Sequence, residues 1–119
     1  MFKPISRPMH GYTDYNYVAT VSIAPEMMGF TDEEMATRLC RMLSSTIFVS
    51  SLFTRAEWGM VRVMPYTAHL IADTAGGALA LSAPWLFGFA GNPRARNTFI
   101  AMGLFGLMAG LLSQPEEMK

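Results

Sequence analysis

Charged side chains are scarce in this chain, because Asp, Glu, Lys and Arg together make up only 15% of its 119 residues. Ordinary soluble domains contain roughly a quarter. The acidic and basic residues cancel to a formal net charge of zero, which gives no electrostatic case for binding nucleic acid. Apolar residues make up 51% of the chain. This balance favours a membrane protein, and the alternative is a soluble all-α protein with a long buried core.

Cysteine is nearly absent as well. The single Cys40 excludes an intramolecular disulfide and a multi-cysteine metal site. The N-terminal residues lack the uninterrupted apolar run of a signal peptide, so we expect neither cleavage nor export. The sequence shows no nucleophile–base arrangement, phosphate-binding glycine loop or metal-spaced cluster of Cys and His. We therefore expect a protein that is not an enzyme.

An internal repeat becomes visible when the chain is aligned with itself at an offset of 59 residues. No gap is needed, and each copy reads H-x3-D-x9-A-P-x3-G-F. The matched pairs are His10 with His69, Asp14 with Asp73, Pro25 with Pro84, Gly29 with Gly88 and Phe30 with Phe89. A gapless set that keeps these residue types together predicts a duplicated unit.

The first half of each unit predicts a helix. It begins near Pro8 in copy one and near Pro65 in copy two, because proline is tolerated in the first helical turn. The helix runs to the Ala-Pro of the motif. The Gly-Phe that follows predicts the exit, since glycine accepts the left-handed conformation of a helix end.

The second half of each unit predicts another helix, over about 33–54 and about 94–113. Thr31 and Glu34 have the spacing of a capping box, which predicts the start of the earlier one. Asn92-Pro93 resembles an N-cap followed by a first-turn proline, which predicts the start of the later one.

The predicted helices have the lengths of membrane spans, which need about 20 apolar residues. Residues 66–90 qualify apart from His69 and Asp73, and residues 97–113 qualify at the short end. The predicted helix over 8–28 is the weakest candidate for a membrane span. It is included because the matching helix of the second repeat is apolar. We therefore expect an all-α integral membrane four-helix bundle, built from two tandem parallel helical-hairpin repeats.

The chain is expected to form one membrane domain over residues 1–119, bounded by lipid. Its parts are repeat one (about 5–54), a link (55–64), repeat two (about 65–113) and a short polar tail (114–119). An even number of spans in each repeat relates the copies by a pseudo-two-fold axis along the membrane normal, so both termini share one side. The basic residues expected on that side are Lys3, Arg7, Arg55, Arg62 and Lys119. They outnumber those expected on the other side by one, and the positive-inside rule then places both termini in the cytoplasm.

The run SAPWLFGF at 82–89, preceded by HLIAD, resembles the SPW-repeat family of small bacterial membrane proteins. The family motif appears here as Ala83-Pro84-Trp85, and in copy one as Ala24-Pro25-Glu26. The resemblance covers roughly residues 5–113. It implies a four-helix protein of the bacterial inner membrane. The family has no established catalytic activity, so the resemblance implies none.

The paired His and Asp residues are the candidate site. A spacing of four puts His10 and Asp14 on one helix face, and likewise His69 and Asp73. Ionisable residues inside a membrane normally face the bundle interior and pair. Three interpretations stay open. The pairs fix helix register; or His10 and His69 hold a cofactor such as haem, or a metal, with the aspartates orienting the imidazoles; or the aspartates form a proton or ion path.

Small residues predict where helices approach one another. Ala72, Gly76, Ala80 and Pro84 lie at a spacing of four, and Gly103, Gly106 and Gly110 follow in the last predicted helix. Such ridges serve either internal packing or docking onto another membrane subunit. Trp58 and Trp85 lie near predicted span ends and are expected to anchor there. The sequence thus favours a small structural or accessory subunit of a larger membrane complex or homo-oligomer.

Overall fold

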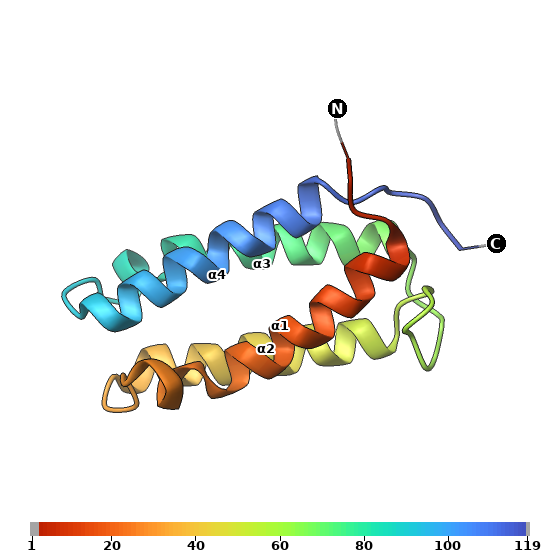
Figure 1. Ribbon diagram of the computed structural model, residues 1–119. Coiled ribbons are helices and arrows are strands. Elements are labelled where there is room, and N and C mark those ends of the chain that lie inside the picture. Colours follow the sequence, from red (N-terminus) through yellow and green to blue (C-terminus); the bar gives the residue numbers. More distant parts are fainter. Residues whose placement is uncertain (1–2, 119) are drawn as a thin grey trace.

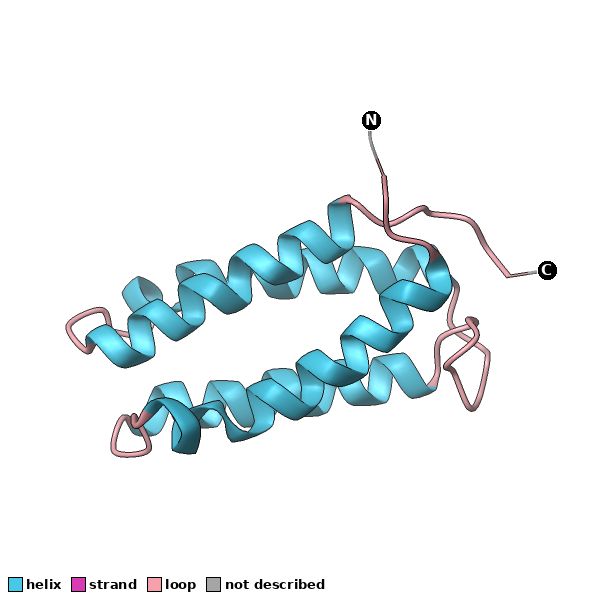
Figure 2. Ribbon diagram, in the orientation of Figure 1, coloured by secondary structure: helices cyan, strands magenta, loops and turns pink. Residues whose placement is uncertain are grey.

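The computed structural model describes residues 3–118, and within that range it confirms an all-α bundle of four helices with no strand (Figure 2). The helices are α1 (Arg7–Met28), α2 (Glu34–Leu52), α3 (Tyr66–Leu86) and α4 (Pro93–Leu111). The predicted tail ends at Lys119, which lies outside the described residues. None of the helices in the described range is both long enough and apolar enough to cross a membrane.

The helices form two hairpins that run in the same direction. Figure 1 shows α1 and α3 starting at the end where the chain termini lie, and α2 and α4 returning to it. The tight turns at residues 29–33 and 87–92 lie together at the opposite end, and the link over 53–65 lies at the terminal end. The most extensive helix contact is between α3 and α4, followed by that between α1 and α2.

The ends of α1 and α3 follow the predicted Gly-Phe signal. Gly29 and Gly88 both adopt positive φ angles, of 75° and 78°. The amides of Phe30 and Phe89 then donate back to the carbonyls of Pro25 and Pro84, at 2.9 Å in each case. These bonds satisfy carbonyls that the helix ends leave free. The helix-exit prediction is confirmed in both copies.

The helix starts are less uniform. Asn92 caps α4 as predicted, its side-chain oxygen accepting from the Ala95 amide at 3.2 Å. The prediction of a capping box from Thr31 to Glu34 is wrong, because α2 begins only at Glu34 and Glu33 is its N-cap residue. The turn after Gly29 uses Thr31 itself, so that hydroxyl lies too far ahead of the helix to accept from its first amides.

The start of α3 is capped by the far end of the chain. Its N-cap residue, Pro65, provides no side-chain acceptor. The Glu117 carboxylate takes this place and accepts from the Tyr66 and Thr67 amides, at 2.8 Å each. A carboxylate is favourable there because the helix dipole is positive at this end. The polar tail therefore has a defined structural role.

The apolar core lies towards the tight turns. Phe30 and Phe89, which follow the two helix-ending glycines, pack around Phe99 of α4, with ring centroids 6.5 and 5.0 Å from it. All three rings are buried, as are Ala36 and Cys40 of α2. The rings join the two hairpins at this end of the bundle.

The contact between α3 and α4 depends on glycines. A Cβ atom added to Gly77 would lie 2.7 Å from the Leu107 amide nitrogen, and one added to Gly103 would lie 2.5 Å from that of Leu81. Added at Gly110, it would collide with the Thr74 side chain. At Gly76, which was also expected on a packing ridge, a Cβ would meet nothing within 4 Å, so this glycine does not serve the packing of α3 against α4. The contact face passes through the neighbouring residue instead.

Candidate functional site: a buried cluster of two His–Asp pairs

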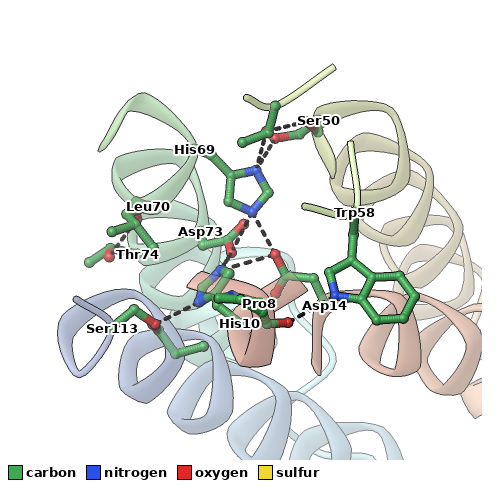
Figure 3. Close-up of polar contacts among 12 residues, drawn as sticks. Pro8, His10, Asp14, Ser50, Trp58, His69, Leu70, Asp73, Thr74 and Ser113 are labelled. Atoms are coloured by element: carbon green, nitrogen blue, oxygen red, sulfur yellow. Dashed lines mark hydrogen bonds and ion pairs between the residues drawn. The ribbon is translucent and has the colours of Figure 1, made fainter. Parts of the chain in front are cut away.

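The four residues of the repeated H-x3-D motif meet in one place, near the starts of α1 and α3 (Figure 3). Their exposed fractions are only 1% for His10, 4% for Asp14, 2% for His69 and 7% for Asp73. One ligand-type atom from each lies within 4.8 Å of all the others. We call these four residues the His–Asp cluster.

The hydrogen bonds of the cluster cross between the hairpins. His10 Nε2 bonds to Asp73 Oδ2 at 2.8 Å, and His69 Nε2 bonds to Asp14 Oδ2 at 2.5 Å. Within each helix, the Nε2 and Oδ2 atoms of the pair are 3.0 Å and 3.1 Å apart. The Nε2 atom of each histidine thus contacts both carboxylates. The two copies of the motif are therefore bonded to each other across the hairpins.

A hydroxyl group supports the outer nitrogen of each histidine. Ser113 Oγ lies 2.6 Å from His10 Nδ1, and Thr54 Oγ1 lies 2.9 Å from His69 Nδ1. Ser50 Oγ also contacts His69 Nδ1, at 2.7 Å. Ser113 follows the end of α4 and Thr54 follows the end of α2, so the segments after these two helices complete a site that α1 and α3 begin.

The hydroxyl contacts bear on the tautomers. Ser113 Oγ also donates to the Ala109 carbonyl, and Thr54 Oγ1 to the Ser50 carbonyl. In that arrangement both oxygens accept from Nδ1, which favours hydrogen on the Nδ1 of His10, whereas Ser50 Oγ can either donate to or accept from the Nδ1 of His69. Each Nε2 then faces carboxylate oxygens, so a bare nitrogen there would set lone pair against lone pair. A proton on each Nε2, or a shared cation, must lie between them.

The backbone around the cluster repeats at the same 59-residue offset. Ile5 donates to Leu112 and accepts from Gln114, at 3.2 and 2.8 Å. Met64 donates to Phe53 and accepts from Arg55, at 2.8 Å in both cases. The segment before His10 is thereby bonded to the segment that carries Ser113, which contacts His10. In the same way, the segment before His69 is bonded to the segment that carries Thr54, which contacts His69.

Aromatic rings shield the cluster from the terminal end. Tyr66 stacks on His69, with centroids 6.5 Å apart, and meets His10 edge-on at 5.8 Å. Trp58 covers Gly11, where an added Cβ would lie 2.6 Å from the indole ring. The Trp58 Nε1–H donates to the Pro8 carbonyl at 3.0 Å. The glycine in the first turn of α1 is what lets the indole approach.

Two small cavities adjoin the cluster. A cavity of about 20 Å³ borders Asp14 and Asp73, and one of about 10 Å³ borders His10, His69 and Ser51. Haem, the cofactor suggested for the two histidines, does not fit. A porphyrin must occupy the plane between its axial ligands, whereas here carboxylate oxygens already contact both Nε2 atoms. A single metal ion is far smaller, and two nitrogens with two carboxylate oxygens suit one.

The other motif residues lie at the opposite end of the bundle. Pro25, Gly29, Phe30, Pro84, Gly88 and Phe89 form the helix exits and core described above, and none contributes to the cluster. Trp85 is 60% exposed. Glu26, its counterpart in copy one, forms an ion pair with Arg41 at 2.6 Å. The motif therefore serves two separate places in the fold.

The sequence analysis missed the hydroxyl partners. Thr54 and Ser113 are separated by the same 59 residues as the histidines and both carry a β-hydroxyl, so the alignment contained the signal. It also missed Ser51, whose hydroxyl is buried without a hydrogen-bond partner. A scan against models of protein families, a search of curated proteins and a search of solved structures each found no match.

Proposed function

We propose that this protein is a small non-enzymatic subunit of the bacterial inner membrane, in which the bundle is surrounded by lipid and by helices of other subunits. The His–Asp cluster joins the two hairpins and fixes their register. The observation that carries the proposal is the outward-facing surface of the bundle, which is apolar along the middle of the helices. The resemblance of residues 82–89 to the SPW-repeat family supports the same proposal.

The middle of the bundle presents large apolar side chains outward. Charged residues are absent from α2 after Arg41 and from α4 after Arg96, and in α3 the only charged residue is Asp73. The exposed apolar residues of these segments include Met42, Phe48, Ile71, Leu79, Leu86, Leu104 and Met108. Monomeric soluble proteins rarely expose large contiguous apolar patches. The His–Asp cluster residues of α3, His69 and Asp73, are buried and would not face lipid.

Basic residues concentrate at the two ends of the bundle. Lys3, Arg7, Arg55 and Arg62 belong to the terminal end, and Arg38, Arg41, Arg94 and Arg96 to the end with the tight turns. Helices of 19 to 22 residues are roughly 30 Å long at about 1.5 Å per residue, which matches the thickness of a hydrocarbon core. Charged ends and an apolar middle suit a bilayer.

A groove between α1 and α4 suits a partner helix. Its volume is about 550 Å³, and its walls include Tyr12, Asn16, Thr20, Thr98, Ala101 and Phe105. The hydroxyls of Thr20 and Thr98 and the amide of Asn16 bond to carbonyls of their own helices. These residues thus turn mostly apolar atoms towards the groove, and their small size lets another helix approach closely.

The proposal is tested by fractionation and crosslinking of the full chain in its native host. We expect the chain in the membrane pellet, resistant to an alkaline wash and extracted only by detergent. A photo-crosslinking residue in place of Ala101, in the groove, should give a discrete crosslink to one membrane protein. The same residue in place of Leu79, on the outer face of α3, is the matched control and should crosslink to lipid alone. Recovery of the chain as a monomer without detergent would refute the proposal.

A further inference from the structure

We infer that the His–Asp cluster is a binding site for one divalent transition-metal ion, held by the Nε2 atoms of His10 and His69 and the Oδ2 atoms of Asp14 and Asp73. This inference does not depend on where the protein resides. It rests on four features of the cluster: the convergence of its donor atoms, the tautomers of its histidines, its charge, and an unpartnered hydroxyl beside it.

The donor atoms are almost at metal-binding separation. The four Nε2-to-Oδ2 distances are 2.5 to 3.1 Å. A tetrahedral ion with bonds of about 2.0 Å needs roughly 3.3 Å between neighbouring ligand atoms. An outward movement of a few tenths of an ångström by each side chain would therefore admit the ion. The donors are held on two rigid helices, and each histidine is four residues from an aspartate on the same face.

The hydroxyl contacts leave the correct nitrogens for a metal. Because the Nδ1 atom of each histidine contacts a hydroxyl group, the Nε2 atoms are the ones that face inward and can ligate an ion. Metal-binding histidines almost always donate their other N–H to a protein acceptor, which fixes the ring and its tautomer.

The charge of the buried site also matches one divalent cation. Two carboxylates and two neutral imidazoles carry a charge of −2, which is costly to bury unless it is compensated. One divalent ion at the centre of the four donors would compensate this charge in full.

The donor set selects the class of ion. Imidazole nitrogen combined with carboxylate oxygen suits Zn²⁺, Fe²⁺, Co²⁺ or Mn²⁺. Mg²⁺ requires octahedral oxygen ligands, and Ca²⁺ takes six to eight, whereas four inward donors converge here. The absence of thiolates from the cluster disfavours Cu⁺. Zn²⁺ and Co²⁺ are therefore the appropriate probes.

An unpartnered hydroxyl borders the same place. Ser51 is 5% exposed, and its Oγ has no hydrogen-bond partner. It lines the cavity of about 10 Å³ that also borders His10, Asp14 and His69. A buried hydroxyl without a partner is unfavourable. A water held in this cavity beside the bound ion's ligands would supply the missing bond.

The test is metal binding by the purified full chain. The protein is first stripped with a chelator and then titrated with Co²⁺ or Zn²⁺ alone. We expect one ion per chain by elemental analysis, and a tetrahedral-type visible absorption band on adding Co²⁺ that Zn²⁺ removes. Asp73→Asn keeps an oxygen that can accept from Nε2–H, so the fold should survive, and we expect its affinity to fall at least about 100-fold. Asp32→Asn, in the turn at the opposite end, is the matched control and should bind like the wild type.

A second variant tests the orientation of the imidazole. Ser113→Ala removes the hydroxyl that contacts His10 Nδ1 at 2.6 Å, and should weaken Co²⁺ binding by about 10–100-fold. It carries the test if Asp73→Asn does not fold, as judged by circular dichroism. The inference is overturned if folded wild-type protein takes up no Co²⁺ or Zn²⁺ at millimolar concentration. It is equally overturned if the folded cluster variants bind as tightly as Asp32→Asn.

Discussion

Gly76 and Gly77 are neighbours in α3, and we predict that replacing each with alanine changes stability in opposite directions. At Gly76 an added Cβ meets nothing within 4 Å. Alanine is favoured over glycine inside a helix by roughly 0.5–1 kcal/mol. Gly76→Ala should therefore raise the free energy of unfolding by about that amount.

At Gly77 the same atom has no room. It would lie 2.7 Å from the Leu107 nitrogen, 2.9 Å from the Gly106 carbonyl carbon and 3.0 Å from the Gly103 oxygen. All three are backbone atoms, so α4 as a whole must move away. Forcing extra atoms into a packed interface typically costs about 1–3 kcal/mol. After the gain in helix propensity, Gly77→Ala should lower the free energy of unfolding by about 1–2 kcal/mol.

The assay is reversible unfolding of the two variants and the wild type in the same solvent, followed by circular dichroism. The expected separation between the variants is about 1.5–3 kcal/mol, which exceeds the error of such measurements. The variants share composition, helix and sequence neighbourhood, so the difference isolates the contact between α3 and α4. Equal stabilities, or a change of the same sign in both, would refute the packing argument.

Two further predictions concern the terminal end of the bundle. Glu117→Ala should remove the cap of α3, at a cost of about 1 kcal/mol, and should speed hydrogen exchange at the Tyr66 and Thr67 amides, whereas Glu116→Ala should leave their exchange unchanged. The hydrogen-bonded Arg7 guanidinium lowers the pKa of Glu57 below its ordinary value of 4.5, so their ion pair should contribute stability above that pH and lose it as the pH falls through the lowered pKa. Melting temperatures between about pH 3 and 6 should show this loss in the wild type, and a Glu57→Gln variant with an unchanged slope would contradict it.

Much of the local structure was predictable because local chemistry dictates it. Proline in a first turn, Asn92 before Pro93 and glycine after an Ala-Pro each restrict the backbone within a few residues. The number, type and approximate bounds of the helices therefore followed from the sequence. The convergence of His10, Asp14, His69 and Asp73 was one of the expectations, since buried ionisable groups on matching helix faces must find one another.

What the sequence by itself determined was the set of helices, their exits and the polar face of each copy. Only the tertiary structure decided which atoms meet across the hairpins: His10 with Asp73 in addition to its own Asp14, Ser113 and Thr54 behind the imidazoles, and Glu117 at the start of α3. It also decided that Gly77, and not Gly76, meets α4. The reason is that helical periodicity gives the spacing of a face but not the rotation of one helix against another, which depends on packing along the whole length of both.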